Sequence, residues 1–528
     1  MLKEIALFFR GINRKYFADY FAALLLAFIF FSWLQSSPTL PEPDSFYHAK
    51  MAVFLSDGQM LSQFPWLQEI GLAENFVDHH FLYHLILAPF VRWFDPLIGV
   101  KIATIIFASL AVLLIYWLFK KFEIKWPFLF MVILLASQPW LFRASLVKAP
   151  AVLLSFLLFA FYFVAHQKYK SLAFISFLAV WLYAGWPLLP ALVILYILLV
   201  WFLEKIKDQD SIWFRIKGFL KIKKNKVVPW PGAMYCLGGI IAGLIINPYF
   251  PYNLNFYWQQ TVKIALINYQ NIIGVGGEWY PYGFINLITD ASLVCALLVV
   301  SLLVFILTFK KQSVYSWFWG ILAVLFFLLT LKSRRNVEFF IPFAVIFSAF
   351  AFSDCVKRLS FVKMKMLIGA SGRAILGIIF LIISLSFLVQ IPKDLTAAKR
   401  DINNGWPLDH YQEASYWLKE NTPPGSIVFN ADWDDFPFLF YYNSHNYYLL
   451  GLDPTFMYEK NQKRYQKYVD ITLGKIGTNL KQIIKEEFKA DYVFLDNQHA
   501  VLNNNLRLDP NFDLVYYDNE GKIYQVTD

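Results

Sequence analysis

The stretch "FAALLLAFIFFSWLQSSPTLPEPDSFYHAK", residues 21–50, joins a long apolar segment to a polar one that contains acids and a histidine. The residues before it include Lys3, Arg10, Arg14 and Lys15. A basic flank, an apolar run and no small-residue cleavage site are typical of a retained signal anchor. The sequence therefore predicts a cytoplasmic N-terminus and an external location from residue 36 onward.

The composition predicts further membrane spans. The chain has 528 residues, of which 58% are hydrophobic and 16% charged, whereas soluble domains have about 25% charged residues. Uncharged apolar runs recur over the first three quarters, so we expect about eleven transmembrane helices of roughly 20 residues. After the first, they are 97–119, 126–142, 149–165, 171–185, 188–203, 232–248, 289–309, 314–331, 337–353 and 372–391.

The charge distribution predicts two domains. Residues 392–528 have 14 Lys and Arg against 20 Asp and Glu, while the rest of the chain has 33 against 17. The basic excess belongs to membrane loops, so no nucleic acid is needed to explain it. If the spans alternate in direction, five of the loops between them are predicted to be cytoplasmic, and all five are basic. These loops are 120–125, 166–170, 204–226, 310–312 and 357–365. We expect a transmembrane domain over 1–391 and a soluble extracytoplasmic domain over 392–528 of a multi-pass cell-membrane protein.

The tail is expected to be an α/β domain. "EASYWLKENTPPGSIVFNADWDDFP" (413–437) predicts a helix, a Pro-Pro-Gly turn and a strand that ends in acids. "ADYVFLDN", "FDLVYYDN" and "KIYQVTD" are further predicted strands. The three cysteines lie outside the tail and match no metal motif, so no disulfide framework is predicted. The segment "NADWDDFPFLFYYN" (430–443) either recognises an acceptor or packs the tail on the membrane part.

The external segment 42–84 contains the first candidate site. It holds six acids, Asp44 and Asp78 among them, and half of the eight histidines. A carboxylate at the membrane edge can act as a general base toward a hydroxyl or hold a divalent cation. Alternatively, Asp44 and Asp78 only cap helices. His48 and His84 are expected to pack, although His80 and His84 would share a helix face.

A basic cluster, "KSRRNVEFF" (332–340), breaks the charge rule because it is predicted to be external. Guanidinium groups donate paired hydrogen bonds to phosphate, so Arg334 and Arg335 are candidate ligands of a lipid phosphate or pyrophosphate. Arg143 and Lys148 are a weaker form of the same signal. Attraction to anionic headgroups is the alternative.

A third external loop, "GVGGEWYPYG" (274–283), places Glu278 and Trp279 between aromatic residues. Sugars stack on such rings, which makes these two residues, with His79 and His80, candidates for a substrate loop. An interfacial aromatic belt explains the same pattern.

Together these features resemble the GT-C glycosyltransferases, and most of all the catalytic subunit of oligosaccharyltransferase. The likeness rests on the retained first span, "PDSFYHAK" in the first external loop, "SRRNVEFFIPFAV" (333–345) before a late helix and a soluble tail on the same side. "NADWDDFP" (430–437) is similar to that subunit's tryptophan–aspartate signature, without its paired tryptophans or its tyrosine-glycine ending. The family's second acidic motif has no counterpart, since "SQPWLFRASLVK" (137–148) contains no acid.

The resemblance implies transfer of a sugar from a polyprenyl-phosphate or pyrophosphate donor to a glycan, lipid or protein outside the membrane. It makes Asp44 the catalytic carboxylate, with Asp78 beside it, and Arg334 or Arg335 the donor phosphate ligand. A divalent cation, Mg²⁺ or Mn²⁺, stays an open alternative, for which Asp44 is a candidate ligand and Asp78, His79 and His80 would replace the missing acidic motif. A polysaccharide polymerase or ligase depends less on an aspartate in the first loop. A transporter or flippase of lipid-linked glycans predicts charges near the membrane midplane, where this sequence has few.

Overall fold

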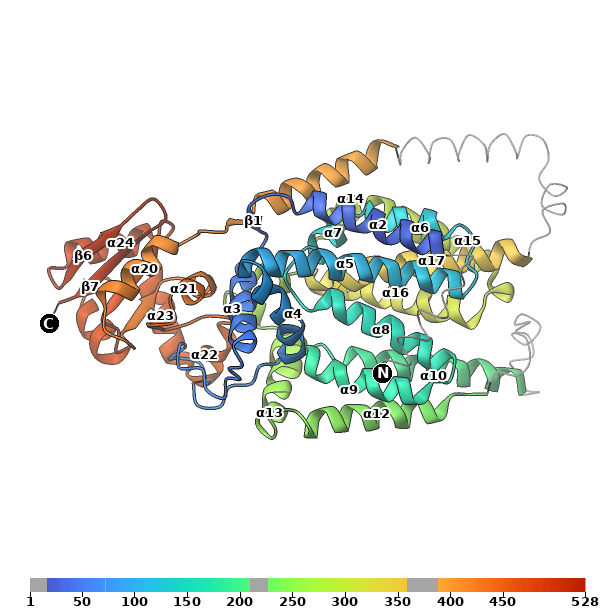
Figure 1. The fold of residues 1–528 in the computed structure, drawn as a ribbon, viewed down its shortest axis with the longest axis horizontal. Helices are drawn as coiled ribbons and strands as arrows, with labels where there is room; N and C mark the ends of the chain where they lie inside the picture. Colours follow the sequence, from blue (N-terminus) through green and yellow to red (C-terminus); the bar gives the residue numbers. More distant parts are fainter. Residues whose placement is uncertain (1–16, 72, 209–226, 359–387, 528) are drawn as a thin grey trace.

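The computed structural model describes residues 17–71, 73–208, 227–358 and 388–527. The basic N-terminus, most of the predicted span 372–391 and parts of the basic loops 204–226 and 357–365 lie outside these residues. Figure 1 shows an elongated molecule with a helical bundle at one end and a sheet region at the other. Two short helices, α3 (Asp44–Ser56) and α4 (Phe81–Trp93), lie between them.

The bundle is that of a helical multi-span membrane protein. Among the described residues, five helices are long and apolar enough to cross a membrane, or seven spans if two bent pairs count as one each. The five are α2 (Phe17–Leu34), α5 (Pro96–Lys121), α10 (Leu188–Asp208), α16 (Val314–Lys332) and α17 (Val337–Arg358). The pairs, bent by 78° and 98°, are α6 (Pro127–Leu135) with α7 (Gln138–Ala144) and α14 (Phe284–Asp290) with α15 (Ser292–Leu307).

The predicted count of eleven spans is not confirmed. Three predicted spans are apolar helices shorter than the roughly 20 residues that a bilayer requires. They are α8 (Pro150–Ala165), α9 (Tyr169–Leu182) and α12 (Trp230–Ile245). The fourth short apolar helix is α4, which the sequence did not predict as a span.

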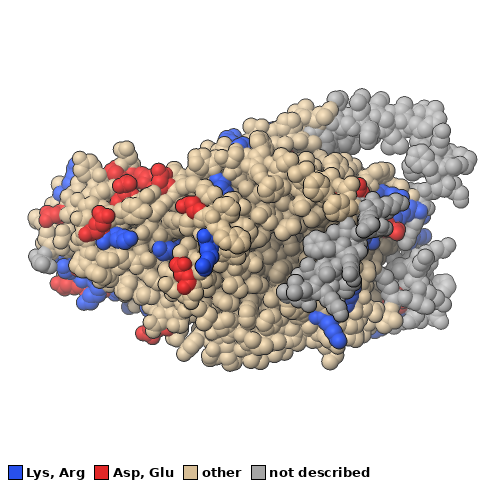
Figure 2. Space-filling model, in the orientation of Figure 1, with Lys and Arg blue, Asp and Glu red and all other residues tan. Residues whose placement is uncertain are grey.

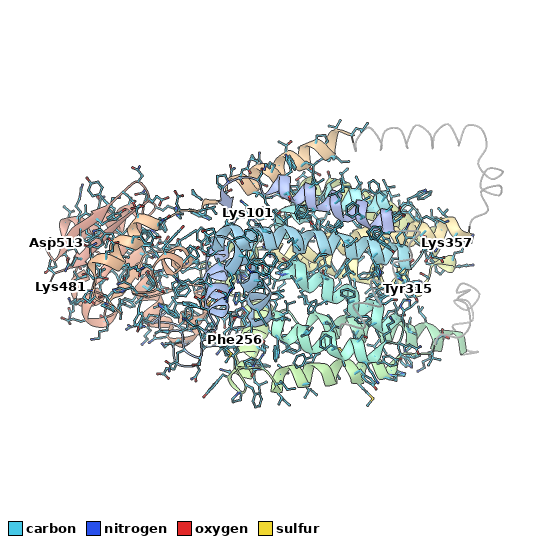
Figure 3. The ribbon with its side chains drawn as sticks, in the orientation of Figure 1. Lys101, Phe256, Tyr315, Lys357, Lys481 and Asp513 are labelled. Atoms are coloured by element: carbon cyan, nitrogen blue, oxygen red, sulfur yellow. The ribbon has the colours of Figure 1, made fainter. Side chains whose placement is uncertain are left out.

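Charged side chains avoid the middle of the bundle. Figure 2 shows a largely uncharged belt on the visible face, with acids and bases gathered over the sheet region. Lys357, in a predicted cytoplasmic loop, lies at the end of the bundle opposite Lys481 and Asp513 of the sheet region (Figure 3). This arrangement agrees with the predicted topology, while the orientation in the membrane stays a prediction.

The C-terminal region contains a mixed five-stranded sheet with helices around it. The strand order is β4-β3-β5-β7-β6, in which β4, β3 and β5 are parallel and the last two strands antiparallel. The strands are β3 (Ile427–Asn430), β4 (Tyr447–Tyr448), β5 (Tyr492–Asp496), β6 (Phe512–Tyr517) and β7 (Gly521–Val526). The helices are α20 (Gln412–Asn421), α21 (Phe436–Tyr442), α22 (Thr455–Lys460), α23 (Gln462–Thr472) and α24 (Ala500–Leu508). The four predicted strands and the helix before the Pro-Pro-Gly turn are confirmed, whereas the boundary at 391/392 stays a prediction.

The first external loop is part of this sheet region. Leu67 forms a parallel bridge with Tyr448, so the loop extends the sheet at its β4 edge. Arg464 of α23 donates two hydrogen bonds to Glu69, at 2.6 and 2.7 Å. The loop and the C-terminal region are therefore held together by backbone and by ion-pair contacts.

Aromatic side chains of α21 pack on α3. The ring of Phe46 lies 4.7 Å from that of Phe438 and 5.7 Å from that of Tyr441, centroid to centroid. A second contact is the short antiparallel pair of β1 (Thr39–Leu40) and β2 (Trp406–Pro407). For these aromatic residues of 430–443, the structure agrees with the packing alternative.

Candidate functional site

The candidate site begins with the segment that leads into α3. Lys101 of α5 donates a hydrogen bond to the carbonyl oxygen of Thr39 at 2.8 Å. On the other side, Gly405 lies so close to Leu40 that a side-chain Cβ would overlap its carbonyl group, so only glycine fits there. The segment is thereby fixed from two sides, and α3 begins at Asp44.

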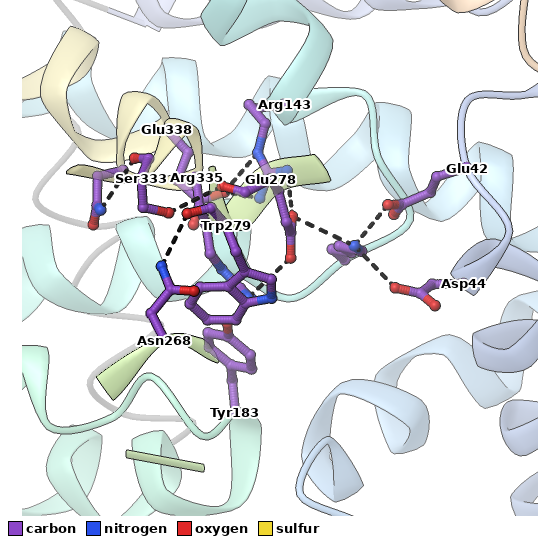
Figure 4. A network of polar contacts seen from close by, with 12 residues as sticks. Glu42, Asp44, Arg143, Tyr183, Asn268, Glu278, Trp279, Ser333, Arg335 and Glu338 are labelled. Carbon is purple, nitrogen blue, oxygen red and sulfur yellow. Dashed lines mark hydrogen bonds and ion pairs between the residues drawn. The ribbon is translucent and has the colours of Figure 1, made fainter. Parts of the chain in front are cut away.

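Three carboxylates surround one ammonium at this point (Figure 4). The Nζ atom of Lys148 lies 2.6 Å from Glu42 Oε2, 2.9 Å from Asp44 Oδ2 and 3.7 Å from Glu278 Oε2. The carboxylate of Asp44 therefore forms an ion pair, which the capping alternative did not predict. Its side chain is also the most exposed of the four, at 34%.

Glu278 extends the network to two arginines. Arg143 Nη1 lies 2.6 Å from Glu278 Oε2, and Arg335 Nη1 lies 2.9 Å from Oε1. The Nε and Nη2 atoms of Arg143 both donate to Glu338 Oε2, at 3.0 and 2.7 Å. One chain of ion pairs thus connects Glu42 and Asp44 with Arg335, and we call these residues, with Lys148, Glu278, Arg143 and Glu338, the charged cluster.

The loop that holds Glu278 is anchored by its backbone. Ser333 Oγ donates to the carbonyl oxygen of Glu278 at 2.9 Å, and Asn268 Nδ2 donates to that of Trp279, also at 2.9 Å. The guanidinium of Arg335 lies over the Trp279 ring, 4.7 Å from its centroid. The Trp279 ring thus faces a protein cation, and a sugar that stacked on it would need its other face.

The two neighbouring arginines point to different places. Arg335 donates to Glu278 and to the Tyr183 hydroxyl, inside the charged cluster. Arg334 is exposed and donates to the carbonyl oxygen of Pro281 at 3.2 Å. The structure therefore brings Arg335 to the site and leaves Arg334 at its rim.

The cluster holds four acids and three bases, and burial sets their proton affinities. Burial raises the pKa of Glu42 to about 7, against the attraction of the Lys148 ammonium. Burial also disfavours the ionised form of Glu278, but Arg335, Lys148 and Arg143 hold its pKa well below its usual range. Glu42 can therefore exchange a proton near neutral pH.

Asp78 and the neighbouring histidines form a separate group. Asp78 is buried, accepts a hydrogen bond from the His80 backbone N–H at 3.0 Å and from His84 Nδ1 at 2.7 Å. His48 Nδ1 lies 2.7 Å from His84 Nε2. The contact to His80, in the turn that begins α4, is one that the capping alternative for Asp78 predicts. His48 and His84 are buried, as the packing prediction expects, and both are also hydrogen-bonded through their ring nitrogens.

The predicted set of metal ligands is not assembled. Asp44 pairs with Lys148, Asp78 pairs with His84, and the ring of His79 packs on that of Phe256 at 5.1 Å. Among the described residues, one group of imidazoles has its nitrogen atoms within 4.8 Å of one another, and it consists of His48, His80 and His84. Of the four predicted ligands, this group includes only His80.

Sequence reasoning missed two features of the charged cluster. Glu42 was not singled out, although "PEPD" places it two residues before Asp44. The role of Lys148 as the cation between three carboxylates was also missed. The sequence did contain a hint of this role. The segment 137–148 has bases but no acid, so its bases could pair with the acids of the first loop.

Comparisons with known proteins identify the fold. No protein-family model and no curated sequence matches the chain. Its structural neighbours are GT-C glycosyltransferases. The apo oligosaccharyltransferase of Archaeoglobus fulgidus matches with a TM-score of 0.61 over 92% of this chain and 70% of its own, at 13% identity. ArnT from Cupriavidus metallidurans, bound to undecaprenyl phosphate, matches with a TM-score of 0.52 over 97% and 98%, at 14% identity. The arabinofuranosyltransferase AftD from mycobacteria matches with a TM-score of 0.54 over 98% and 40%, at 10% identity.

Proposed function

We propose that this chain is an integral-membrane glycosyltransferase, which moves a sugar or oligosaccharide from a polyprenyl-phosphate or pyrophosphate donor to an extracytoplasmic acceptor. The observation that supports this function best is the charged cluster, which links Asp44 to Arg335 through Lys148 and Glu278. Such a cluster offers a proton acceptor and a phosphate ligand in one site. Two neighbours support a lipid-linked donor, since their structures contain dolichol-phosphate and undecaprenyl phosphate.

In this proposal Asp44 is the catalytic carboxylate. Its exposed side chain takes the proton of the acceptor as the new bond to the sugar's anomeric carbon forms. The bond from that carbon to the phosphate oxygen breaks, and its electron pair leaves with the phosphate. Glu42 acts as a positioning residue, because it competes with Asp44 for the ammonium of Lys148.

Arg335 is the proposed ligand of the leaving phosphate, and Arg334 approaches from the rim. A guanidinium that gains a phosphate as partner stabilises the charge that develops during departure. Arg143 has three of its nitrogen donors bonded to Glu278 and Glu338, so we propose that it positions Glu278 instead of binding the donor. Trp279 and the adjacent aromatic residues would border the sugar.

The proposed mechanism has no step through a metal ion at Asp44. The residues predicted to hold one lie in two groups, and Lys148 already provides positive charge between Glu42, Asp44 and Glu278. Asp78 therefore has no direct part in the proposed proton transfer. His79 and His80 lie behind Tyr183, whose ring stacks on His80 at 5.2 Å.

The proposal places the acceptor and the C-terminal region on the extracytoplasmic side of the cell membrane. The charged cluster joins the start of α3 to loops of the bundle, and α21 of the C-terminal region packs on α3, so an acceptor would enter between these parts. Membrane lipids surround the bundle, and nucleic acid has no part. The identity of the sugar and the acceptor is left to experiment.

The test is sugar release from a panel of polyprenyl-phosphate and pyrophosphate sugars, measured with purified protein in detergent. Wild type is compared with Asp44→Asn, with and without Mg²⁺ or a chelator. Loss of the proton acceptor should lower the rate by about 10²–10⁴-fold, while the apparent melting temperature stays close to that of wild type. A fully active Asp44→Asn protein would contradict the role of Asp44. A protein that neither releases sugar from these lipids nor binds any of them would contradict the proposed function.

A further inference from the structure

A second polar cluster lies beside the charged one. It consists of His48 of α3, His80, which directly precedes α4, and His84 of α4, whose ligand nitrogen atoms lie within 4.8 Å of one another. His84 is 0% exposed and His48 3%, whereas His80 is half-buried. We call these three residues the histidine cluster.

Local structure explains why these imidazoles converge. His80 directly precedes α4, and the backbone N–H of His84 donates to the His80 carbonyl at 2.9 Å. Residues four apart in a helical turn share a face, and here that face meets α3. The ring centroid of His48 lies 4.8 Å from that of His80 and 5.0 Å from that of His84.

Asp78 fixes the orientation of His84. Its Oδ2 atom accepts the Nδ1–H of His84 at 2.7 Å, so the lone pair of His84 is on Nε2, which faces His48. A carboxylate behind an imidazole is the usual arrangement around metal-binding histidines, because it sets the tautomer and raises ligand basicity. The structure thus provides both the ligand and the group that orients it.

The other two imidazoles differ: His48 Nδ1 donates its hydrogen to the lone pair of His84 Nε2, so His48 changes tautomer when it binds a metal. The Nδ1 atom of His80 is buried and has no hydrogen-bond partner among the residues that the structure describes. Both rings pack on aromatic side chains, His48 on Tyr83 and His80 on Tyr183, a setting that favours the uncharged imidazole. Neutral imidazoles bind metal ions, whereas protonated ones do not.

We propose that His48, His80 and His84 bind one Zn²⁺ ion, with Asp78 orienting His84. Three imidazoles and an open fourth position suit Zn²⁺, whose bonds to nitrogen are about 2.0–2.1 Å long. Mg²⁺ and Ca²⁺ prefer oxygen ligands and would bind poorly. The three nitrogen atoms, within 4.8 Å of one another here, would reach such distances by rotation of the side chains.

Through α3, which contains both His48 and Asp44, the ion would help to hold the charged cluster in place. Asp44 precedes His48 by four residues, so both lie on one face of α3. A metal that joins α3 to α4 therefore fixes the helix turn that presents Asp44. On the other side, Tyr183 stacks on His80 and accepts a hydrogen bond from Arg335. This inference does not depend on the proposed transferase activity, since metal binding is measured directly.

The experiment uses the full chain in detergent, without an affinity tag and after removal of metal by a chelator. Titration with Co²⁺ should give strong visible absorption bands of a four-coordinate ion, saturating at one Co²⁺ per chain. Zn²⁺ should abolish these bands and excess Mg²⁺ should not. Failure of the wild-type protein to bind Co²⁺ or Zn²⁺ stoichiometrically would overturn the proposal, whatever the activity assay gives.

Variants identify the ligands. His48→Gln, His80→Gln and His84→Gln should each lose the bands, and Asp78→Asn should weaken Co²⁺ binding by about 10–100-fold. His79→Gln is the matched control, because its ring is buried next to His80 but lies outside the cluster, and it should bind as wild type does. Retained bands in His84→Gln, or a loss with His79→Gln alone, would overturn the assignment. X-ray absorption at the zinc edge of the wild-type protein counts nitrogen ligands even if a variant fails to fold.

Discussion

The charged cluster and the histidine cluster share α3 but are built in opposite ways. The charged cluster joins side chains from four distant segments of the chain and consists of ions that neutralise one another. The histidine cluster comes from two adjacent helical segments and consists of three imidazoles, of which burial favours the neutral form of His48 and His80. The first depends on pairing across the fold, the second on local geometry.

This difference has a physical consequence. Removal of one ion from a buried network leaves its partners without compensation, which costs more than the pair itself contributes. Removal of one neutral imidazole leaves an unpaired hydrogen-bonding group and a smaller penalty. Substitutions in the two clusters should therefore differ both in size and in their response to pH.

Lys148→Met is expected to have the largest effect on stability. It leaves Glu42, Asp44 and Glu278 near one another without their shared ammonium, at a cost of about 3–5 kcal/mol. The apparent melting temperature in detergent should fall strongly at pH 7.5 and less at pH 5.5, because Glu42, with a pKa of about 7, is protonated at the lower pH.

Lys332→Met is the matched control for this substitution. Lys332 also lies at the end of its span near the site, but it is exposed and donates only to a backbone carbonyl at 3.1 Å. It should unfold as wild type does at both pH values. Equal melting temperatures for Lys148→Met and wild type at pH 7.5 would contradict the dependence of the charged cluster on its cation.

Arg335→Ala is expected to have the second largest effect, which is a loss of affinity for the donor. Hydrogen bonds to a charged partner contribute about 1.5–3 kcal/mol, so donor affinity should fall by about 10–100-fold. Arg334→Ala, at the adjacent exposed position, should reduce affinity less. The two variants are compared by their affinity for a polyprenyl-phosphate sugar. This affinity is measured from how much the donor raises the melting temperature of each variant. If Arg334→Ala has the larger effect, the rim and not the cluster holds the phosphate.

Much of the fold could be predicted from the sequence, because each signal was local. Apolar runs, the Pro-Pro-Gly turn and alternating strand patterns identified the bundle and four strands of the sheet. The two-residue strand β4 and the bridge from Leu67 to Tyr448 were not predictable, since backbone hydrogen bonds across the fold create them. The span count failed where helices such as α9 are shorter than a bilayer requires.

The candidate site was predicted residue by residue and not as a set. Asp44, Lys148, Arg143, Glu278 and Arg335 were each singled out, because a charge beside an apolar run needs a reason. Their mutual pairing depends on which loops meet, and no spacing in the sequence shows that. Asp78 was grouped with Asp44 because both are acids of one loop, whereas the fold turns Asp78 toward His84.

Glu42→Gln should have the smallest effect and distinguishes the two clusters by pH. In wild type, transfer should increase as pH rises through about 7, since Glu42 then ionises and draws Lys148 away from Asp44, which frees Asp44 to accept a proton. The glutamine cannot ionise, so the variant should keep the low rate of the acidic side, about tenfold or less below wild type, with no step near pH 7. In His79→Gln the step should stay, because burial holds the pKa of His79 at about 4, far below this range. A pH profile of the sugar-release rate decides the matter: if Glu42→Gln keeps the step near pH 7, the proton belongs to another group, and the balance of charge around Lys148 does not control Asp44.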